Sequence, residues 1–109
     1  MERRIGLRGR TDFRVIARNG ILAAHCRGIE ISSTGIILDR GREVTARETP
    51  LVMKLELLLP ERFRRLRALA RPVWSFGSQQ ALRFIHMSDV DRLDLAEHLD
   101  ILAIRGVLN

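Results

Sequence analysis

The order of the patterned segments is what most constrains the fold of this chain. Alternating, strand-like stretches occupy residues 12–87, and a single helical stretch follows at 88–105. A run of strands followed by one helix favours a small antiparallel barrel with a helical lid over alternating strand–helix units. The sequence therefore predicts a mainly β fold, a six-stranded antiparallel β-barrel with a C-terminal α-helix. At 109 residues the chain is expected to form one domain.

Short turn signals separate the expected strands. Asn19-Gly20 is a dipeptide typical of a hairpin turn. Pro60 ends the apolar stretch that follows Pro50, because proline lacks a donor for a sheet ladder. Residues 64–70 have helix propensity, but residues 72–76 favour a strand that follows on from them. The expected strands are 13–18, 21–33, 36–38, 51–59, 72–76 and 81–87.

The stretch 88–105 is the clearest helix in the sequence. Ser88 is expected to be its N-cap, with Asp91 at the capping-box position. Arg105 followed by Gly106 gives a stop signal. We expect the helix to cover an edge or an open end of the sheet with one apolar stripe. That stripe consists of Leu95, Ala96, Leu99, Leu102 and Ala103.

Arginine dominates the charge of the chain. The formal net charge is +6, and Lys54 is the single lysine among 19 basic residues. A basic protein attracts anionic partners, and planar guanidinium groups suit bidentate recognition of phosphates and guanine edges. Arginine content alone does not identify the partner, because a GC-rich genome also favours arginine codons.

The remaining composition argues against several classes of site. Cys26 is the one cysteine, so it has no internal disulfide partner and is expected to be a buried thiol. His25, His86 and His98 lack metal-ligand spacing and are expected at the surface or half-buried. No apolar run approaches the ~20 residues that cross a bilayer, and no apolar segment follows the basic N-terminus as in a secretory signal. We expect a cytoplasmic protein with no membrane insertion, no metal and no cofactor.

Two short motifs concentrate the candidate functional residues. Residues 1–11 are expected to form a flexible basic arm, which carries Arg4-Ile-Gly-Leu-Arg8. After 21 intervening residues follows Glu30-Ile-Ser-Ser-Thr-Gly35. Glu30 and Ser32 share one face of an expected strand, and Gly35 permits a positive φ or a close backbone approach. No nucleophile–base pairing or phosphate loop of the GxxxxGK[ST] type accompanies them, so we expect a binding protein and no enzyme.

The two motifs and the C-terminal half of the chain together resemble the PilZ domain family. That family combines an RxxxR motif on an N-terminal arm with a [D/N]xSxxG motif on a small β-barrel. The segment "ARPVWSFGSQQALRFIHMSDVDRLDLAEHL" at 70–99 also resembles the family's strands and closing helix. The resemblance covers nearly the whole chain. It implies one PilZ-like domain over residues 1–109, with a barrel at 12–87 and a helix at 88–105.

The resemblance implies a receptor for the bacterial second messenger cyclic di-GMP that signals to a downstream protein in motility, biofilm or pilus control. Arg4 and Arg8 would contact phosphate and the guanine O6 or N7 atoms. Ser32 would bond guanine or phosphate, and Gly35 would let the chain turn close to the ligand. Glu30 stands where the family has Asp or Asn, so its acceptor is one methylene longer.

Several alternatives stay open at the level of sequence. Arg10 with Arg14, and Arg14 with Arg18, also satisfy RxxxR, although Arg4 and Arg8 precede the first expected strand. The departure at Glu30 favours a second function, a PilZ-like interaction adaptor that no longer binds the nucleotide. Binding to RNA or DNA is disfavoured because the chain has no tyrosine and only 5% aromatic residues. Trp74 and Phe84 are expected in the core and not as stacking platforms.

Overall fold

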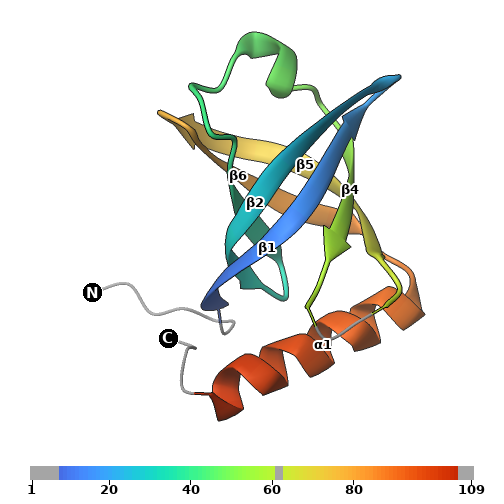
Figure 1. The fold of residues 1–109 in the computed structure, drawn as a ribbon. Coiled ribbons are helices and arrows are strands. Elements are labelled where there is room, and N and C mark those ends of the chain that lie inside the picture. The colour runs from blue at the N-terminus through green and yellow to red at the C-terminus, as the bar shows by residue number, and fades with distance from the viewer. Residues whose placement is uncertain (1–7, 61–62, 106–109) are drawn as a thin grey trace.

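The protein is a closed, six-stranded antiparallel β-barrel with a helix across one end (Figure 1). The computed structural model describes residues 8–60 and 63–105, and describes 8–10 by their backbone alone. The strands neighbour one another in the order β1-β2-β3-β6-β5-β4, which confirms the predicted fold class. The elements are β1 (Arg8–Asn19), β2 (Leu22–Ser32), β3 (Gly35–Asp39), the 3-10 helix η1 (Ala46–Glu48), β4 (Met53–Leu58), β5 (Leu66–Phe76), β6 (Gln79–His86) and α1 (Asp89–Ile104).

Strands β1 and β5 begin five or more residues earlier than expected. β1 begins at Arg8, so residues 8–11 belong to the sheet and not to an arm. β5 begins at Leu66, where helix propensity competes with strand pairing. Leu66, Ala68 and Ala70 are buried alternately and pair with β4, which is the period of two of a strand. Burial against the barrel interior therefore overrides local propensity in this segment.

The barrel interior is the hydrophobic core. β1 contributes Val15 and Ala17, and β4 contributes Leu55 and Leu57, all at alternate positions. Cys26 is buried as expected, and burial raises the pKa of its thiol. Phe84 is half-buried and packs against this core.

Helix α1 closes the end of the barrel opposite to η1 (Figure 1). Its N-cap is Ser88, whose hydroxyl accepts from the Asp91 backbone N–H at 3.1 Å, as predicted. Ala96 and Ala103 were expected in the buried stripe but are exposed. His98 takes the buried place between them and is 2% exposed, with its ring edge-on to Phe13 at a centroid distance of 5.8 Å. The helix buries Asp91, Leu95, His98, Leu99 and Leu102.

The prediction for His98 was therefore wrong, because a stripe at positions 95, 98, 99 and 102 follows the helix period more closely than the stripe read from apolar residues alone. His25 and His86 are exposed. No helix among the described residues is long and apolar enough to span a bilayer. Over the same residues no cluster of three or more His, Cys, Asp or Glu side chains is arranged to hold a metal ion.

Candidate ligand-binding site

Strand pairing brings the two sequence motifs together. In the β1–β2 ladder the Cα partner of Arg8 is Ser32, and the Cα partner of Arg10 is Glu30. The second arginine of Arg4-Ile-Gly-Leu-Arg8 thus lies beside the second motif on the neighbouring strand. Arg4 lies outside the described residues.

An irregularity in β2 turns Glu30 and Ser32 to the outside of the barrel. Gly28 pairs with Leu38 while Glu30 pairs with Ile37, so Ile29 is an extra residue relative to β3. Cys26 and Gly28 are buried before this bulge, and Ile31 is buried after it. Strict alternation from Gly28 would have directed the two motif side chains inward. A β-bulge re-aims side chains in this way, and such bulges are enriched beside functional sites.

Ser32 shapes the turn between β2 and β3. Its hydroxyl oxygen accepts from the backbone N–H groups of Thr34 and Gly35, each at 3.2 Å. The Thr34 hydroxyl lies at the same distance from it. A serine hydroxyl that bonds backbone groups two and three residues on is a recognised turn device. Ser32 therefore fixes the start of β3 at Gly35.

Gly35 is required by a close backbone approach and not by a positive φ. Glycines at positive φ are Gly20, Gly41 and Gly77 in the described residues. A Cβ added at Gly35 would lie 2.4 Å from the carbonyl oxygen of Leu82 on β6. Of the two roles that the sequence left open for Gly35, the structure supports the close approach.

The motif residues line a cavity of about 160 Å³ on the outer face of the barrel. Glu30, Ser32 and Gly35 form one wall, and Trp74 of β5 contributes to the opposite side. Trp74 was expected in the core but is 46% exposed. The cavity is completed by Ile31, Ile36, Ile37, Ala81 and Leu82.

The exposure of Trp74 has the same origin as that of Glu30. Ala70 is buried and Pro72 pairs with Leu82, so alternation alone would place residue 74 inside the barrel. The register shifts between Pro72 and Trp74, which leaves Val73 as an extra residue and pairs Trp74 with Ala81. Bulges in β2 and β5 thus direct an acid and an indole ring toward one cavity.

Two arginines that sequence reasoning missed lie beside Gly35. Arg83 is the Cα partner of Gly35 on one side and of Arg71 on the other. Both arginines are exposed, and neither side chain has a hydrogen bond or ion pair to another described residue. Like charges directly opposite one another destabilise a sheet, and an anion would relieve this repulsion. The two arginines are 12 positions apart, so the signal lies in their pairing and not in a sequence motif.

The alternative arginine pairs are less well placed. Arg18 donates from Nε to Glu56 at 2.8 Å and is held on the β1–β4 side of the barrel. Arg14 is exposed and pairs with Arg27 and Leu58 in the two ladders of β1. Neither residue lines the cavity of the motif residues.

The fold is similar to two solved structures. The inhibitor of motility MotI/DgrA of Bacillus subtilis matches with a TM-score of 0.80 and 15% identity, over 96% of this chain and 53% of that chain. This chain thus spans about half the length of MotI/DgrA. An uncharacterized protein of Legionella, Lpg0364, matches with a TM-score of 0.60 and 15% identity, over 91% of this chain and 96% of that one. No family model matches the sequence, and neither does any curated protein. At this level of identity the likeness concerns the fold alone, and the fold is PilZ-like.

Proposed function

We propose that this protein is a bacterial receptor for cyclic di-GMP that relays its occupied state to a downstream protein controlling motility, a biofilm or pili. The observation that carries the proposal is the pairing of Arg8 with Ser32, beside a cavity lined by Glu30, Ser32 and Gly35. The likeness of the fold to an inhibitor of motility supports a role of this kind. The ligand is bound and not converted, so we assign the protein no catalytic activity.

The chemistry of the site suits a guanine nucleotide. The arginine of RxxxR can donate two bonds to guanine O6 and N7, a contact worth about 1–3 kcal/mol of discrimination. The Glu30 carboxylate can accept from the guanine N–H edge, and the exposed face of Trp74 can stack on a purine. Arg71 and Arg83 can receive a phosphate.

The size of the cavity limits how much of the ligand it holds. About 160 Å³ is small beside the roughly 300–1,000 Å³ of pockets that enclose drug-sized ligands. One base would enter the cavity, and the rest of the dinucleotide would lie over the arginine pair on β5 and β6. The bound ligand would then bridge the β2–β3 turn and the far strands of the barrel.

Titration calorimetry with cyclic di-GMP tests the proposal directly. Wild-type protein is expected to bind, and Arg8→Ala is expected to abolish binding without a change in melting temperature. Arg14→Ala removes the same charge from a position that does not line the cavity and should bind as the wild type does. Trp74 is the single tryptophan, so its fluorescence should change on binding. A folded wild-type sample that gives neither heat nor a fluorescence change at high micromolar nucleotide would rule the receptor out.

A second candidate function is an interaction adaptor that has lost the nucleotide. Two observations favour it: Glu30 replaces the shorter acid or amide of the family motif, and the Ser32 hydroxyl is already engaged by the β2–β3 turn. Glu30→Asp separates the two candidates. If the protein is a receptor, the wild type should bind cyclic di-GMP and Glu30→Asp should bind it equally or more tightly. If the protein is an adaptor, the wild type should not bind the nucleotide.

A further inference from the structure

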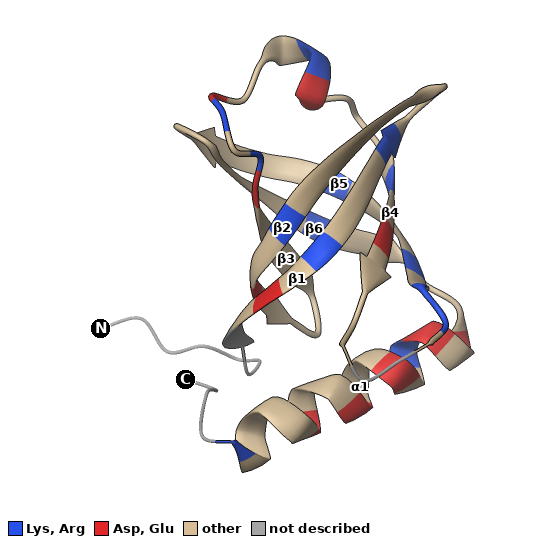
Figure 2. Ribbon diagram, in the orientation of Figure 1, with Lys and Arg blue, Asp and Glu red and all other residues tan. Residues whose placement is uncertain are grey.

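A second basic surface lies on the other side of the barrel, over β1, β4 and β5. Its residues follow the strand pairing: Arg18 pairs with Lys54, which pairs with Leu69, while Glu56 pairs with Arg67. We call this surface the basic face. Among the described residues it holds five basic side chains and one carboxylate, a surplus of four positive charges. Figure 2 shows basic positions on these three strands. The charged members of the basic face are Arg14, Arg18, Lys54, Glu56, Arg65 and Arg67.

The one carboxylate of the basic face is fully engaged. Glu56 accepts from Arg65 at 2.7 Å and from Arg18 at 2.8 Å. These two hydrogen bonds lower the pKa of Glu56, so it stays ionised and braces both arginines. Lys54 and Arg67 are exposed, and neither side chain has a hydrogen bond or ion pair within the described part of the chain. Two cations next to an already satisfied acid are available to a partner.

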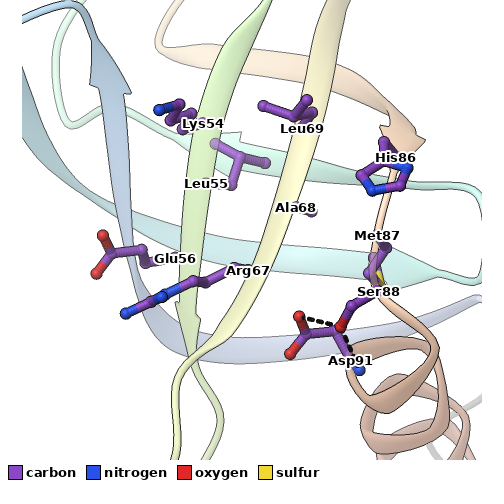
Figure 3. Close-up of a pocket in the computed structure, with 10 residues that line it drawn as sticks. All are labelled: Lys54, Leu55, Glu56, Arg67, Ala68, Leu69, His86, Met87, Ser88 and Asp91. Carbon is purple, nitrogen blue, oxygen red and sulfur yellow. Dashed lines mark hydrogen bonds between the residues drawn. The ribbon is translucent and has the colours of Figure 1, made fainter.

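A cavity of about 340 Å³ adjoins these two cations. Figure 3 shows Lys54 and Arg67 on β4 and β5, with Leu69 beside them and the start of α1 on the other side. The acid at that end, Asp91, is bonded to Ser88 and to Arg64, so it leaves the cations uncompensated. The floor is apolar and consists of Leu55, Ala68, Leu69 and Met87.

We propose that the basic face binds an acidic segment of a partner protein, with its carboxylates on Lys54 and Arg67 and one apolar side chain in the cavity. An apolar centre with charged residues at its rim is the arrangement of protein interfaces that receive an anchor side chain. The apolar lining favours a peptide with an apolar side chain over a nucleic acid, which would use the cations but not this lining. The fixed Glu56 bridge pre-orders part of the surface, which reduces the entropy lost on binding.

The basic face is separate from the candidate nucleotide site. No residue lines both cavities. The motif cavity lies over β2, β3, β6 and the end of β5, whereas this one lies over β4, the start of β5 and the junction of β6 with α1. Both ligands can therefore be held at once, and the partner surface exists whether or not the nucleotide binds.

Binding of defined probes tests the proposal without any nucleotide. The probes are a labelled peptide rich in glutamate with a central leucine, the same peptide with serine for leucine, and a DNA duplex of equal charge. Fluorescence anisotropy at low salt would compare the wild type with the pair of changes Lys54→Ala and Arg67→Ala. The matched control is Arg47→Ala with Arg105→Ala, which removes the same charge from exposed sites elsewhere. Melting temperatures verify that all variants are folded.

We expect the Lys54 and Arg67 variant to lose more affinity for the leucine peptide than the control variant does. Two exposed charge pairs worth up to about 1 kcal/mol each correspond to binding of the leucine peptide by the Lys54 and Arg67 variant that is weaker by up to roughly thirtyfold. The control variant should lose much less, and the serine peptide should bind several-fold more weakly than the leucine peptide. Equal losses in both variants, equal affinity for both peptides, or a preference for the duplex would each overturn the proposal.

Discussion

At the scale of single residues, neighbouring members of one motif do different physical work. Ser32 uses its hydroxyl to hold the turn through the Thr34 and Gly35 N–H groups. Gly35 has no side chain because the Leu82 carbonyl oxygen occupies the space that a Cβ would need. Glu30 is the member whose side chain is directed at the cavity without a part in the turn. Residues that hold the turn and a residue that lines the candidate cavity thus alternate within six positions of the sequence.

Gly35→Ala is expected to destabilise the protein. A Cβ at 2.4 Å from a backbone oxygen forces β3 away from β6, and overpacking of this kind costs about 1–3 kcal/mol of unfolding free energy. Urea denaturation measures the change. Ser33→Ala, in the same turn but exposed, should stay within about 0.5 kcal/mol of the wild type. If the two variants had the same free energy of unfolding, β3 and β6 would be able to separate around the added Cβ without loss of stability.

At the scale of elements, two bulges determine the candidate site. The succession of strands along the chain, the helix and its N-cap could be predicted from the sequence because alternation and capping are local signals. The place of Trp74 could not, because a bulge between Pro72 and Trp74 depends on the pairing of β5 with β6. A bulge has no reliable local signal in the sequence. Beyond it, the alternation of inward and outward side chains that the sequence predicts for the strand is therefore wrong. The pairing of Arg71 with Arg83 could not be predicted either, because it depends on the register between β5 and β6.

The N-cap of α1 offers a test at this scale. Ser88→Ala removes the acceptor for the Asp91 N–H and the hydroxyl that donates to the Asp91 carboxylate at 2.7 Å. Loss of an N-cap costs about 1 kcal/mol, so thermal unfolding should shift to lower temperature. Ser88→Thr keeps the hydroxyl and should retain most of the stability. If both variants melt with the wild type, the cap contributes nothing to the closure of the barrel.

At the scale of the whole molecule, charge is divided between barrel and helix. Figure 2 shows a series of acidic positions along α1, whereas basic positions spread over the strands, where single acids also occur. The net positive charge of the sequence is therefore unevenly distributed over the molecule. The barrel is its basic part and attracts an anion first. Sequence composition predicts the sign of a partner's charge, but the separation arises only when the helix packs across the barrel end. The acidic residues of α1 are Asp89, Asp91, Asp94, Glu97 and Asp100.

Acid is expected to weaken the whole fold. Hydrogen bonds from Arg65 and Arg18 lower the pKa of Glu56 below the 4.5 of an ordinary glutamate. Burial opposes ionisation of Glu48, but hydrogen bonds from the Thr45 N–H and from Arg42 outweigh it and also lower that pKa from 4.5. A carboxylate whose pKa is lower in the folded than in the unfolded state stabilises the fold at a pH above its unfolded pKa. This stabilisation is lost as the pH falls through the folded pKa.

Urea unfolding at a series of pH values from neutrality to about pH 3 should therefore show a steady fall in stability below the unfolded pKa of these two acids. The variant Glu56→Gln should have a flatter pH dependence, because it has no carboxylate to protonate at that position. Glu43→Gln, at an exposed glutamate with no such contacts, should keep the wild-type slope. Identical slopes in all three proteins would contradict the assignment of Glu56.

The division of the candidate nucleotide site between distant parts of the chain has a consequence for synthesis. Residues 8–35 leave the ribosome before the opposite wall and can pair as hairpins, yet Trp74, Ala81 and Leu82 of that wall are made dozens of residues later. At roughly 5–20 residues per second, the nascent chain carries both motifs for seconds without a cavity between them. Barrels closed by such long-range pairs also fold slowly, in about milliseconds to seconds. A truncated or newly made chain with both motifs intact therefore lacks the site until β6 pairs with β3.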